Sequence, residues 1–187
     1  MTDHRFLRTD QDIERNFVAL LGSMNFNDIT IAKLVDKTMI SRPTFYEHFN
    51  SLYDLAERTV EEYLCPFKEI FAQALDSKSK HMNIKEIYPQ FANKVADTLI
   101  DCRREYLAVR KIPLGTNSFD QRLKKILLTN LAPYFSDSQS KLKIIYLTSV
   151  LLGNLDFVLE EQRVPKVNEV LAGIESVIGI IAGNGEI

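Results

Sequence analysis

The sequence is poor in the residues that interrupt helices. It holds only seven glycines and six prolines in 187 positions, well below the roughly 12% that the two residues together reach on average. This scarcity excludes collagen-like and linker-rich chains, and it disfavours all-β folds with many tight turns. Long helices with few connections are favoured instead.

Cysteine is scarce as well, and positive charge is not in excess, with 23 basic against 25 acidic residues. Cys65 and Cys102 are too few for a disulfide framework and lack the spacing of metal ligands, so we expect two reduced, buried thiols. The formal net charge is -2 at pH 7. A basic coat over the whole surface is therefore excluded, and any DNA-binding role must depend on a local patch.

Targeting and membrane-spanning signals are not evident. The N-terminal MTDHRFLRTDQD lacks the apolar core of a signal peptide, which predicts a cytoplasmic protein. The most apolar stretch, residues 144–159, is shorter than the roughly 20 residues of a spanning helix and contains Asn154 and Asp156. We interpret it as a helix buried on both sides in a soluble protein, with no membrane contact.

Helical periodicity runs along almost the whole chain, and strict alternation extends nowhere over a useful length. The pattern predicts an all-α fold of about nine helices, the first from residue 9 or 10 to residue 25. Later helices are expected to start at Tyr88-Pro89, Ser118, Ser136 and Pro165, with a linker over 76–83. Residues 1–50 would form a compact head domain, and residues 51–187 a helical bundle.

Two short helices joined by a tight turn describe a helix-turn-helix, whose second helix can enter the major groove of DNA. Thr30 and Ser41 are the expected N-caps of these helices. A small core fixes the angle between them, and polar groups face the duplex. The expected core is Leu34, Ile40, Phe45 and Phe49, and the expected DNA-facing residues are Thr30, Ser41, Arg42, Thr44, Tyr46 and His48.

The run from Phe26 to Leu55 resembles the DNA-binding domain of the TetR family of transcriptional regulators. The string Ser41-Arg42-Pro43-Thr44-Phe45-Tyr46-Glu47-His48-Phe49 carries most of the likeness. The resemblance implies that Thr30 contacts a phosphate and that Thr44, Tyr46 and His48 hold the DNA backbone. It places Ser41, Arg42 and Pro43 nearest the base edges, with Arg42 as the best reader because a guanidinium can pair bidentately with guanine.

The chain departs from the family pattern at several positions. Pro43 stands where glycine is common, Thr38-Met39 where a small residue and glycine are usual, and Leu52 where a phosphate-binding lysine is frequent. Residues 1–50 also carry six basic and seven acidic groups. Two interpretations stay open: the acids face away from DNA, or binding is weaker and less salt-sensitive than usual.

The resemblance also implies a homodimer formed by the last two helices and a small-molecule effector enclosed by the middle ones. Effector binding would change the spacing of two heads and release a palindromic operator, as in a repressor. Two alternatives stay open. The apolar residues of the expected dimer interface could instead be buried inside one monomer, and the aromatic residues of the expected effector site could instead pack in the core. The dimer candidates are Leu147, Leu151, Leu155, Val158, Val170, Ile174, Val177 and Ile178; the effector candidates are Phe67, Phe71, Phe91, Arg104, Tyr106, Phe119, Tyr134, Tyr146 and Asn154.

Catalytic signatures are missing from the sequence. It has three histidines and contains no HExxH, GxSxG, phosphate-loop or dinucleotide motif. We therefore expect no enzyme, no metal and no cofactor beyond the effector. The alternative function is a ligand-sensing co-regulator of the same fold that does not bind DNA directly, which the salt dependence of duplex binding would distinguish.

Overall fold

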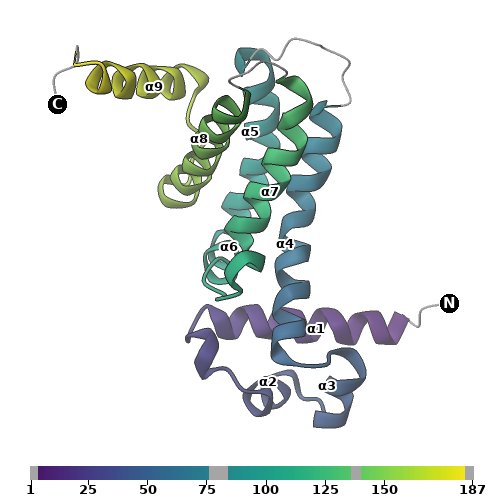
Figure 1. Cartoon of the computed structure of the whole chain (residues 1–187). Coiled ribbons are helices and arrows are strands. Elements are labelled where there is room, and N and C mark those ends of the chain that lie inside the picture. Colours follow the sequence, from purple (N-terminus) through teal and green to yellow (C-terminus); the bar gives the residue numbers. More distant parts are fainter. Residues whose placement is uncertain (1–3, 76–83, 136–139, 184–187) are drawn as a thin grey trace. The chain divides into compact units, whose positions relative to one another are not determined.

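The structure is a computed structural model that describes residues 4–75, 84–135 and 140–183 (Figure 1). Within these ranges it contains nine α-helices, three short 3₁₀ helices and no strand, which confirms the predicted all-α class. The elements are α1 (His4–Leu21), η1 (Phe26–Asp28), α2 (Ile31–Thr38), α3 (Arg42–His48), α4 (Leu52–Leu75), α5 (Ile84–Asp101), α6 (Arg103–Val109), η2 (Gly115–Asn117), α7 (Phe119–Leu131), η3 (Ala132–Tyr134), α8 (Ser140–Glu161) and α9 (Val167–Ile181).

Three of the predicted helix boundaries are wrong. α1 ends at Leu21 rather than at residue 25. α1 begins at His4 rather than near residue 9, because Phe6 in its first turn stacks on the His48 ring at a centroid distance of 4.0 Å. Pro89 lies inside α5 instead of at its start. The predicted linker 76–83 and the predicted helix start at 136–139 lie outside the described residues.

The chain packs as two compact units. Unit 1 comprises Met1–Phe67 and Cys102–Ile126, and unit 2 comprises Lys68–Asp101 and Leu127–Ile187. The expected head, residues 1–50, falls within unit 1. The expected boundary between a DNA-binding head, residues 1–50, and a helical bundle, residues 51–187, stays a prediction.

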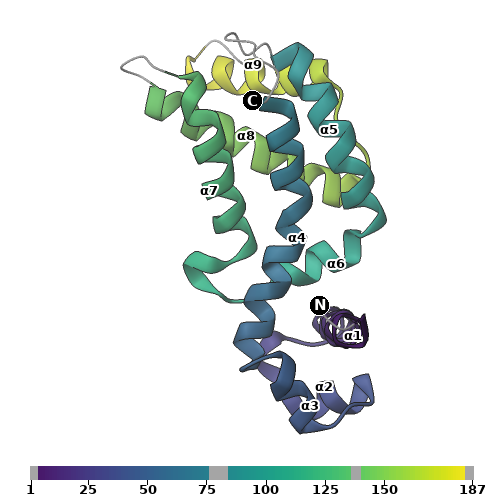
Figure 2. The same cartoon turned by 90° about the vertical axis from the view of Figure 1, so that its right-hand side faces the viewer.

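In unit 1, α1 packs on α2 and α6, and α2 packs on α3. Figure 2 views α1 almost end-on, between α6 and the α2–α3 pair. The apolar stripe of α1 forms the centre of this arrangement, since Ile13 and Phe17 are both 0% exposed. Burial of such side chains contributes about 1.5–3 kcal/mol each and holds the short helices α2 and α3 in place.

Four aromatic rings, those of Tyr63, Phe67, Tyr106 and Phe119, form a second core in unit 1. They meet edge to face at centroid distances of 5.1–6.0 Å, a geometry that suits the aromatic quadrupole. The hydroxyl of Tyr106 donates to the Tyr63 carbonyl at 3.3 Å. Burial raises the pKa of Tyr106, so its phenol stays neutral.

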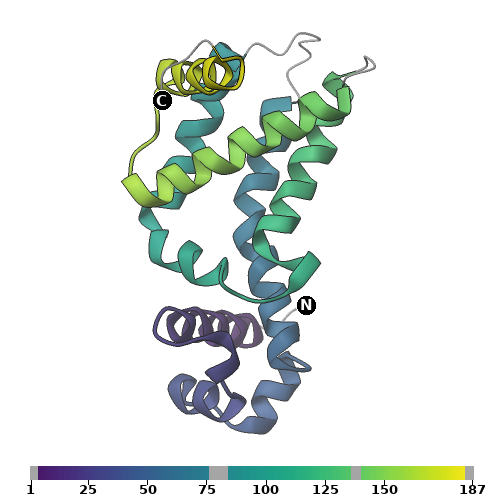
Figure 3. The same cartoon turned by 60° about the vertical axis from the view of Figure 1, so that its left-hand side comes forward.

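In unit 2, α5 packs against both α8 and α9. Figure 3 shows α8 crossing the α5 helix in this unit. The Tyr88 hydroxyl donates to the Pro165 carbonyl at 3.1 Å and so fastens α5 to the segment before α9. Burial of this phenol, followed by the charge of Glu169, raises the pKa of Tyr88 to about 12.

Helix α8 is less buried than its sequence suggests. Only 22% of its most apolar window is buried within the chain, so the expectation of burial on both sides is wrong for a single chain. Its covered face includes Ile144, Thr148, Leu155 and Leu159. Residues 141–161 are long and apolar enough to cross a membrane, a test that core helices of soluble proteins also pass.

The two cysteines form no disulfide, as expected, but they are not both buried. Cys65 is exposed and Cys102 is partly exposed. Cys65 lies on the solvent side of α4, where its thiol donates to the Glu61 carbonyl at 3.4 Å. The expectation of two buried thiols is therefore wrong.

Candidate nucleic-acid interface

The helix-turn-helix is built by the residues that the sequence singled out. Thr30 caps α2, its hydroxyl oxygen accepting from the Lys33 amide at 3.3 Å. Ser41 caps α3 in the same way, accepting from the Thr44 amide at 3.2 Å. Pro43 occupies the first turn of α3, where its missing N–H costs no helical hydrogen bond. The next helix, α4, begins in a similar way, because the Asp54 amide donates to Ser51 Oγ at 3.0 Å.

The turn between the two helices depends on Met39. This residue adopts a left-handed conformation with φ 58°, and its amide donates to the Asp36 carbonyl at 3.2 Å. The next amide, that of Ile40, reaches back to the Val35 carbonyl at 3.0 Å. Such a helix end usually takes glycine, because a Cβ is strained there. The Met39 side chain is 93% exposed and gains no packing in return.

Replacing Met39 by glycine should therefore stabilise the protein by about 0.5–1 kcal/mol. The substitution releases the backbone strain at this position, and the greater conformational entropy of glycine in the unfolded chain offsets part of that gain. Urea unfolding followed by circular dichroism measures this change. The Lys37→Gly variant, placed inside α2 and also exposed, is the matched control and should lose stability by a similar amount. A destabilised Met39→Gly protein would contradict the assigned strain.

The core of the head is nearly as predicted. Leu34 and Phe45 are 0% exposed and Phe49 is 1% exposed, whereas Ile40 is only half-buried. The rings of Phe45 and Phe49 stack at a centroid distance of 5.8 Å. These contacts fix the angle between α2 and α3 and leave the opposite side of α3 to solvent.

The outer side of α3 carries a row of polar and aromatic groups. Ser41, Arg42 and Pro43 are exposed, Tyr46 is 50% exposed, and Thr44 is half-buried. The Ser41 and Thr44 hydroxyls lie 2.8 Å apart. The predicted residue Thr30 is exposed at the start of α2. The structure thus places six of the seven predicted DNA-facing residues at the surface of the helix-turn-helix.

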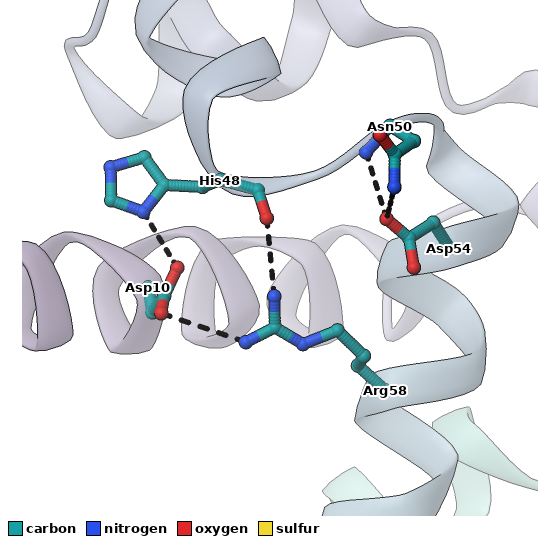
Figure 4. A network of polar contacts seen from close by, with 5 residues as sticks. All are labelled: Asp10, His48, Asn50, Asp54 and Arg58. Carbon is teal, nitrogen blue, oxygen red and sulfur yellow. Dashed lines mark hydrogen bonds and ion pairs between the residues drawn. The ribbon is translucent and has the colours of Figure 1, made fainter.

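His48 is the exception, and its predicted phosphate contact is wrong for the side chain. The imidazole is 4% exposed, and its Nδ1 lies 2.7 Å from Asp10 Oδ1 on α1 (Figure 4). Phe6 covers the ring. His48 therefore fastens α3 to α1 and does not face the duplex.

The same network includes Arg58 of α4. Its guanidinium donates to the His48 carbonyl at 3.1 Å and lies 3.5 Å from Asp10 Oδ2. It also lies over the Phe49 ring, 4.4 Å from the centroid. Figure 4 shows this network beside the Asn50–Asp54 contacts at the start of α4, where the Asn50 amide donates to Asp54 at 2.8 Å. The C-terminal end of α3 is thus held by charged groups of both α1 and α4.

Sequence reasoning missed Asp10 and Arg58 as functional residues. A signal for Asp10 was present, since it shares the apolar stripe of α1 with Ile13 and Phe17, where a carboxylate is costly unless paired. Glu14, one turn further along α1, is also buried at 6% exposure. Two of the head's seven acids therefore point into helix packing, which favours the first of the two open interpretations of its charge balance.

The predicted effector residues are divided between the two units. Phe67, Tyr106 and Phe119 pack against one another in the core of unit 1, and Arg104 is exposed on α6 of the same unit. Phe71 is buried in unit 2 and Tyr134 is half-buried there, whereas Tyr146 is 63% exposed and does not line an interior. The Phe91 side chain lies outside the part of the chain that the structure describes. Asn154 of α8 is half-buried, with its amide nitrogen buried.

The predicted dimer residues divide into two groups. Leu155 and Val158 are 5% and 6% exposed and belong to the core of unit 2, which for these two residues fits the alternative of burial inside one monomer. Val177 and Ile178 of α9 are 55% and 59% exposed. The remaining four, Leu147, Leu151, Val170 and Ile174, are half-buried. The exposed apolar surface instead includes Leu142 and Tyr146 on α8 and Ile181 on α9.

Comparisons with known proteins support the fold. No protein-family model and no curated protein matches the sequence. Among solved structures, the reduced form of NemR from E. coli is similar, with a TM-score of 0.52 and 11% sequence identity. The match covers 90% of this chain and 96% of NemR. At this identity the likeness establishes a shared helical fold.

Proposed function

We propose that this chain is a DNA-binding transcriptional regulator of the TetR type. The observation that carries the proposal is the α2–α3 pair, with capped helix starts, a closed core, and Arg42 and Tyr46 exposed on one outer side. Groups of these types bind phosphates and base edges when a helix enters the major groove. The helical fold that the chain shares with NemR is compatible with the same assignment.

The roles within the interface follow from exposure and chemistry. Arg42 is proposed to read a base edge, with Ser41 and Pro43 beside it, because these residues form the exposed start of α3. Thr30, Thr44 and Tyr46 are proposed to bind phosphates. Asp10, His48 and Arg58 hold α3 in position and do not touch the duplex.

Selection from a pool of random duplexes tests this function. We expect the wild-type protein to enrich a palindromic sequence whose half-sites lie about one helical turn, roughly 34 Å, apart or a multiple of it. Enrichment of no sequence by a folded protein would favour the alternative, a co-regulator that senses a ligand without binding DNA.

The proposed regulator acts as a homodimer through α8 and α9. Unit 2 leaves large apolar side chains of both helices in solvent: Leu142 and Tyr146 on α8, and Val177, Ile178 and Ile181 on α9. Large apolar side chains exposed on successive turns of a helix mark an interaction face. A second copy of the chain would cover it, and a dimer matches the symmetry of a palindromic operator.

The Ile178→Glu variant should shift the protein from dimer to monomer, because a carboxylate would be buried in an apolar interface. Analytical ultracentrifugation at tens of micromolar protein measures the change. Ser176→Glu is the matched control, since Ser176 is exposed on the opposite side of α9 and should leave the dimer intact. A monomeric wild-type protein at these concentrations would contradict the proposed interface.

The proposed regulator releases DNA when a small molecule binds unit 2. Two polar atoms favour this unit, because within the described residues Thr148 Oγ1 and Asn154 Nδ2 are buried without a hydrogen-bond partner. Buried polar groups are rarely left unpaired. By contrast, the predicted aromatic candidates of unit 1 are engaged with one another. A ligand with a hydrogen-bonding group therefore fits α8 better than the aromatic core.

A further inference from the structure

A cleft with a volume of about 670 Å³ lies in unit 1 between α1, α4 and α6. All of its lining residues belong to unit 1, so it is separate from the effector site proposed for unit 2. Its volume falls within the roughly 300–1,000 Å³ of sites that hold small organic molecules. The cleft is therefore large enough for a ligand, and the chemistry of its walls indicates which class.

One face of α1 forms the longest wall of the cleft. Its lining residues recur at helical spacing: Gln11, Glu14, Arg15, Val18, Ala19 and Gly22. Val18 is buried and makes part of this wall apolar. Ala19, Gly22 and the neighbouring Ser23 are small and exposed, so no long side chain from the end of α1 fills the space.

Glu14 places a carboxyl group deep in this wall. The residue lines the cleft and is only 6% exposed. A buried carboxylate is costly unless an opposite charge compensates for the lost water. Burial is the largest cause that raises the pKa of Glu14 to about 8, and the opposing charge of Arg58 does not offset it. The Arg58 guanidinium instead contacts Asp10 and the His48 carbonyl. The chain therefore compensates the Glu14 charge incompletely.

The other two walls add acidic and aromatic groups. Glu62 and Tyr63 come from α4, and Cys102 and Glu105 come from the start of α6. The Tyr63 ring packs edge to face on Tyr106 at a centroid distance of 5.1 Å, which holds it in place. Burial raises the pKa of the Tyr63 phenol, so the ring stays neutral. Carboxylates beside an aromatic ring are the groups that attract an organic cation.

The two arginines of the lining lie toward solvent. The Arg15 side chain is 77% exposed and pairs with Asp12 at 3.5 Å. Arg104 is exposed on α6. Among the five charged residues of the lining, the one that is buried is an acid, Glu14. The interior of the cleft therefore favours a positive ligand over a negative one.

We propose that this cleft binds a small organic cation, whose charged nitrogen pairs with the Glu14 carboxylate and whose apolar part lies against Val18 and the Tyr63 ring. A positive charge within about 4–6 Å of a carboxylate favours its ionised form. The ligand thus supplies the compensating charge that the chain itself provides incompletely. This site goes beyond the proposed function and does not depend on it, because the free protein binds the cation without DNA.

Isothermal titration calorimetry of the free, full-length protein tests the site with benzyltriethylammonium, a permanent cation with apolar arms. We expect saturable binding below about 1 mM, at least about tenfold tighter than that of para-tert-butylbenzoate, an anion of similar size. An absence of cation binding by the wild-type protein in this range would overturn the proposal. Equal or tighter binding of the anion would overturn it as well.

Two variants place the cation in the cleft. Glu14→Gln keeps the size of the side chain and removes its charge, so affinity for the cation should fall by about tenfold or more. Ala19→Leu fills space in the cleft from an exposed position of α1 and should weaken binding to a similar degree without a change of charge. Circular dichroism confirms that each variant is folded.

Each variant has a matched control outside the lining. Glu69→Gln makes the same change of charge at an exposed position of α4, and Ala32→Leu makes the same change of size at an exposed position of α2. Both should bind the cation as the wild type does. Unchanged affinity in either folded cleft variant would show that the cation binds elsewhere, and the proposal would be wrong. Failure of the protein to bind any duplex would refute the proposed function and leave this measurement unaffected.

Discussion

The Asp10→Ala variant should lose about 3 kcal/mol of stability, the typical cost of breaking a buried ion pair by removing one partner. The Asp10 carboxylate is 12% exposed and binds both His48 Nδ1 and the Arg58 guanidinium. Its removal leaves the imidazole of His48 buried without that partner and releases the end of α3. Duplex affinity should fall with stability, since α3 is the proposed reading helix.

Urea unfolding followed by circular dichroism measures the effect, as the chain has no tryptophan for fluorescence. Asp12→Ala is the matched control. Asp12 lies on the same helix, 44% exposed, and pairs only with an exposed Arg15 at 3.5 Å, so its loss should cost well below about 1 kcal/mol. Equal stability losses in the two variants would show that the Asp10 network does not hold the head together.

The Arg42→Ala variant should bind the selected duplex about tenfold to a hundredfold more weakly and lose preference at one base pair in each half-site. A bidentate pair between arginine and guanine contributes roughly 1–3 kcal/mol of discrimination. Arg42 is exposed at the first position of α3, where base edges are read. Fluorescence anisotropy with duplexes that vary one base pair at a time measures both effects.

Two other variants separate base reading from phosphate binding. Tyr46→Ala should weaken binding to all duplexes to a similar degree, because a phosphate contact is independent of sequence. Arg15→Ala, the same change of charge on α1 with a side chain that is 77% exposed, should leave base preference unchanged. An Arg42→Ala protein with intact preference would refute the base-reading role.

The local features of the head could be predicted from sequence because each depends on neighbours in the chain. The caps Thr30 and Ser41 and the core pair Phe45 and Phe49 all act within four residues. His48 could not be assigned in this way. Its partner Asp10 lies 38 residues away, and nothing in the string around His48 reveals that contact.

The C-terminal helices were harder to predict for a different reason. α8 is apolar on most of its circumference, so the pattern does not show which side the chain covers. The sequence pattern therefore placed Leu155 and Val158 in the dimer interface, whereas the structure buries them in unit 2 and exposes Leu142 and Tyr146. The effector candidates stay a prediction, because an aromatic residue at helical spacing packs equally well in a core, as Phe67 and Phe119 do.

The charge balance of the head also has a physical explanation. Counting acids over residues 1–50 suggested a surface poorly suited to DNA. The structure turns Asp10 into a polar network with His48 and Arg58, and it turns Glu14 into a cleft, where burial raises the pKa of its carboxyl group. The acids that oppose DNA binding are thus fewer than the sequence count suggests.

The salt dependence of binding to the selected duplex tests the central claim most directly. The proposal predicts selective binding by the wild-type protein, with affinity falling at least about tenfold between 50 and 200 mM salt as phosphate contacts are lost. The Tyr46→Ala variant should bind more weakly at every salt concentration with a similar slope, because the phenol that it loses is uncharged. A folded, dimeric protein that binds no duplex selectively, or whose binding is indifferent to salt, would contradict the account.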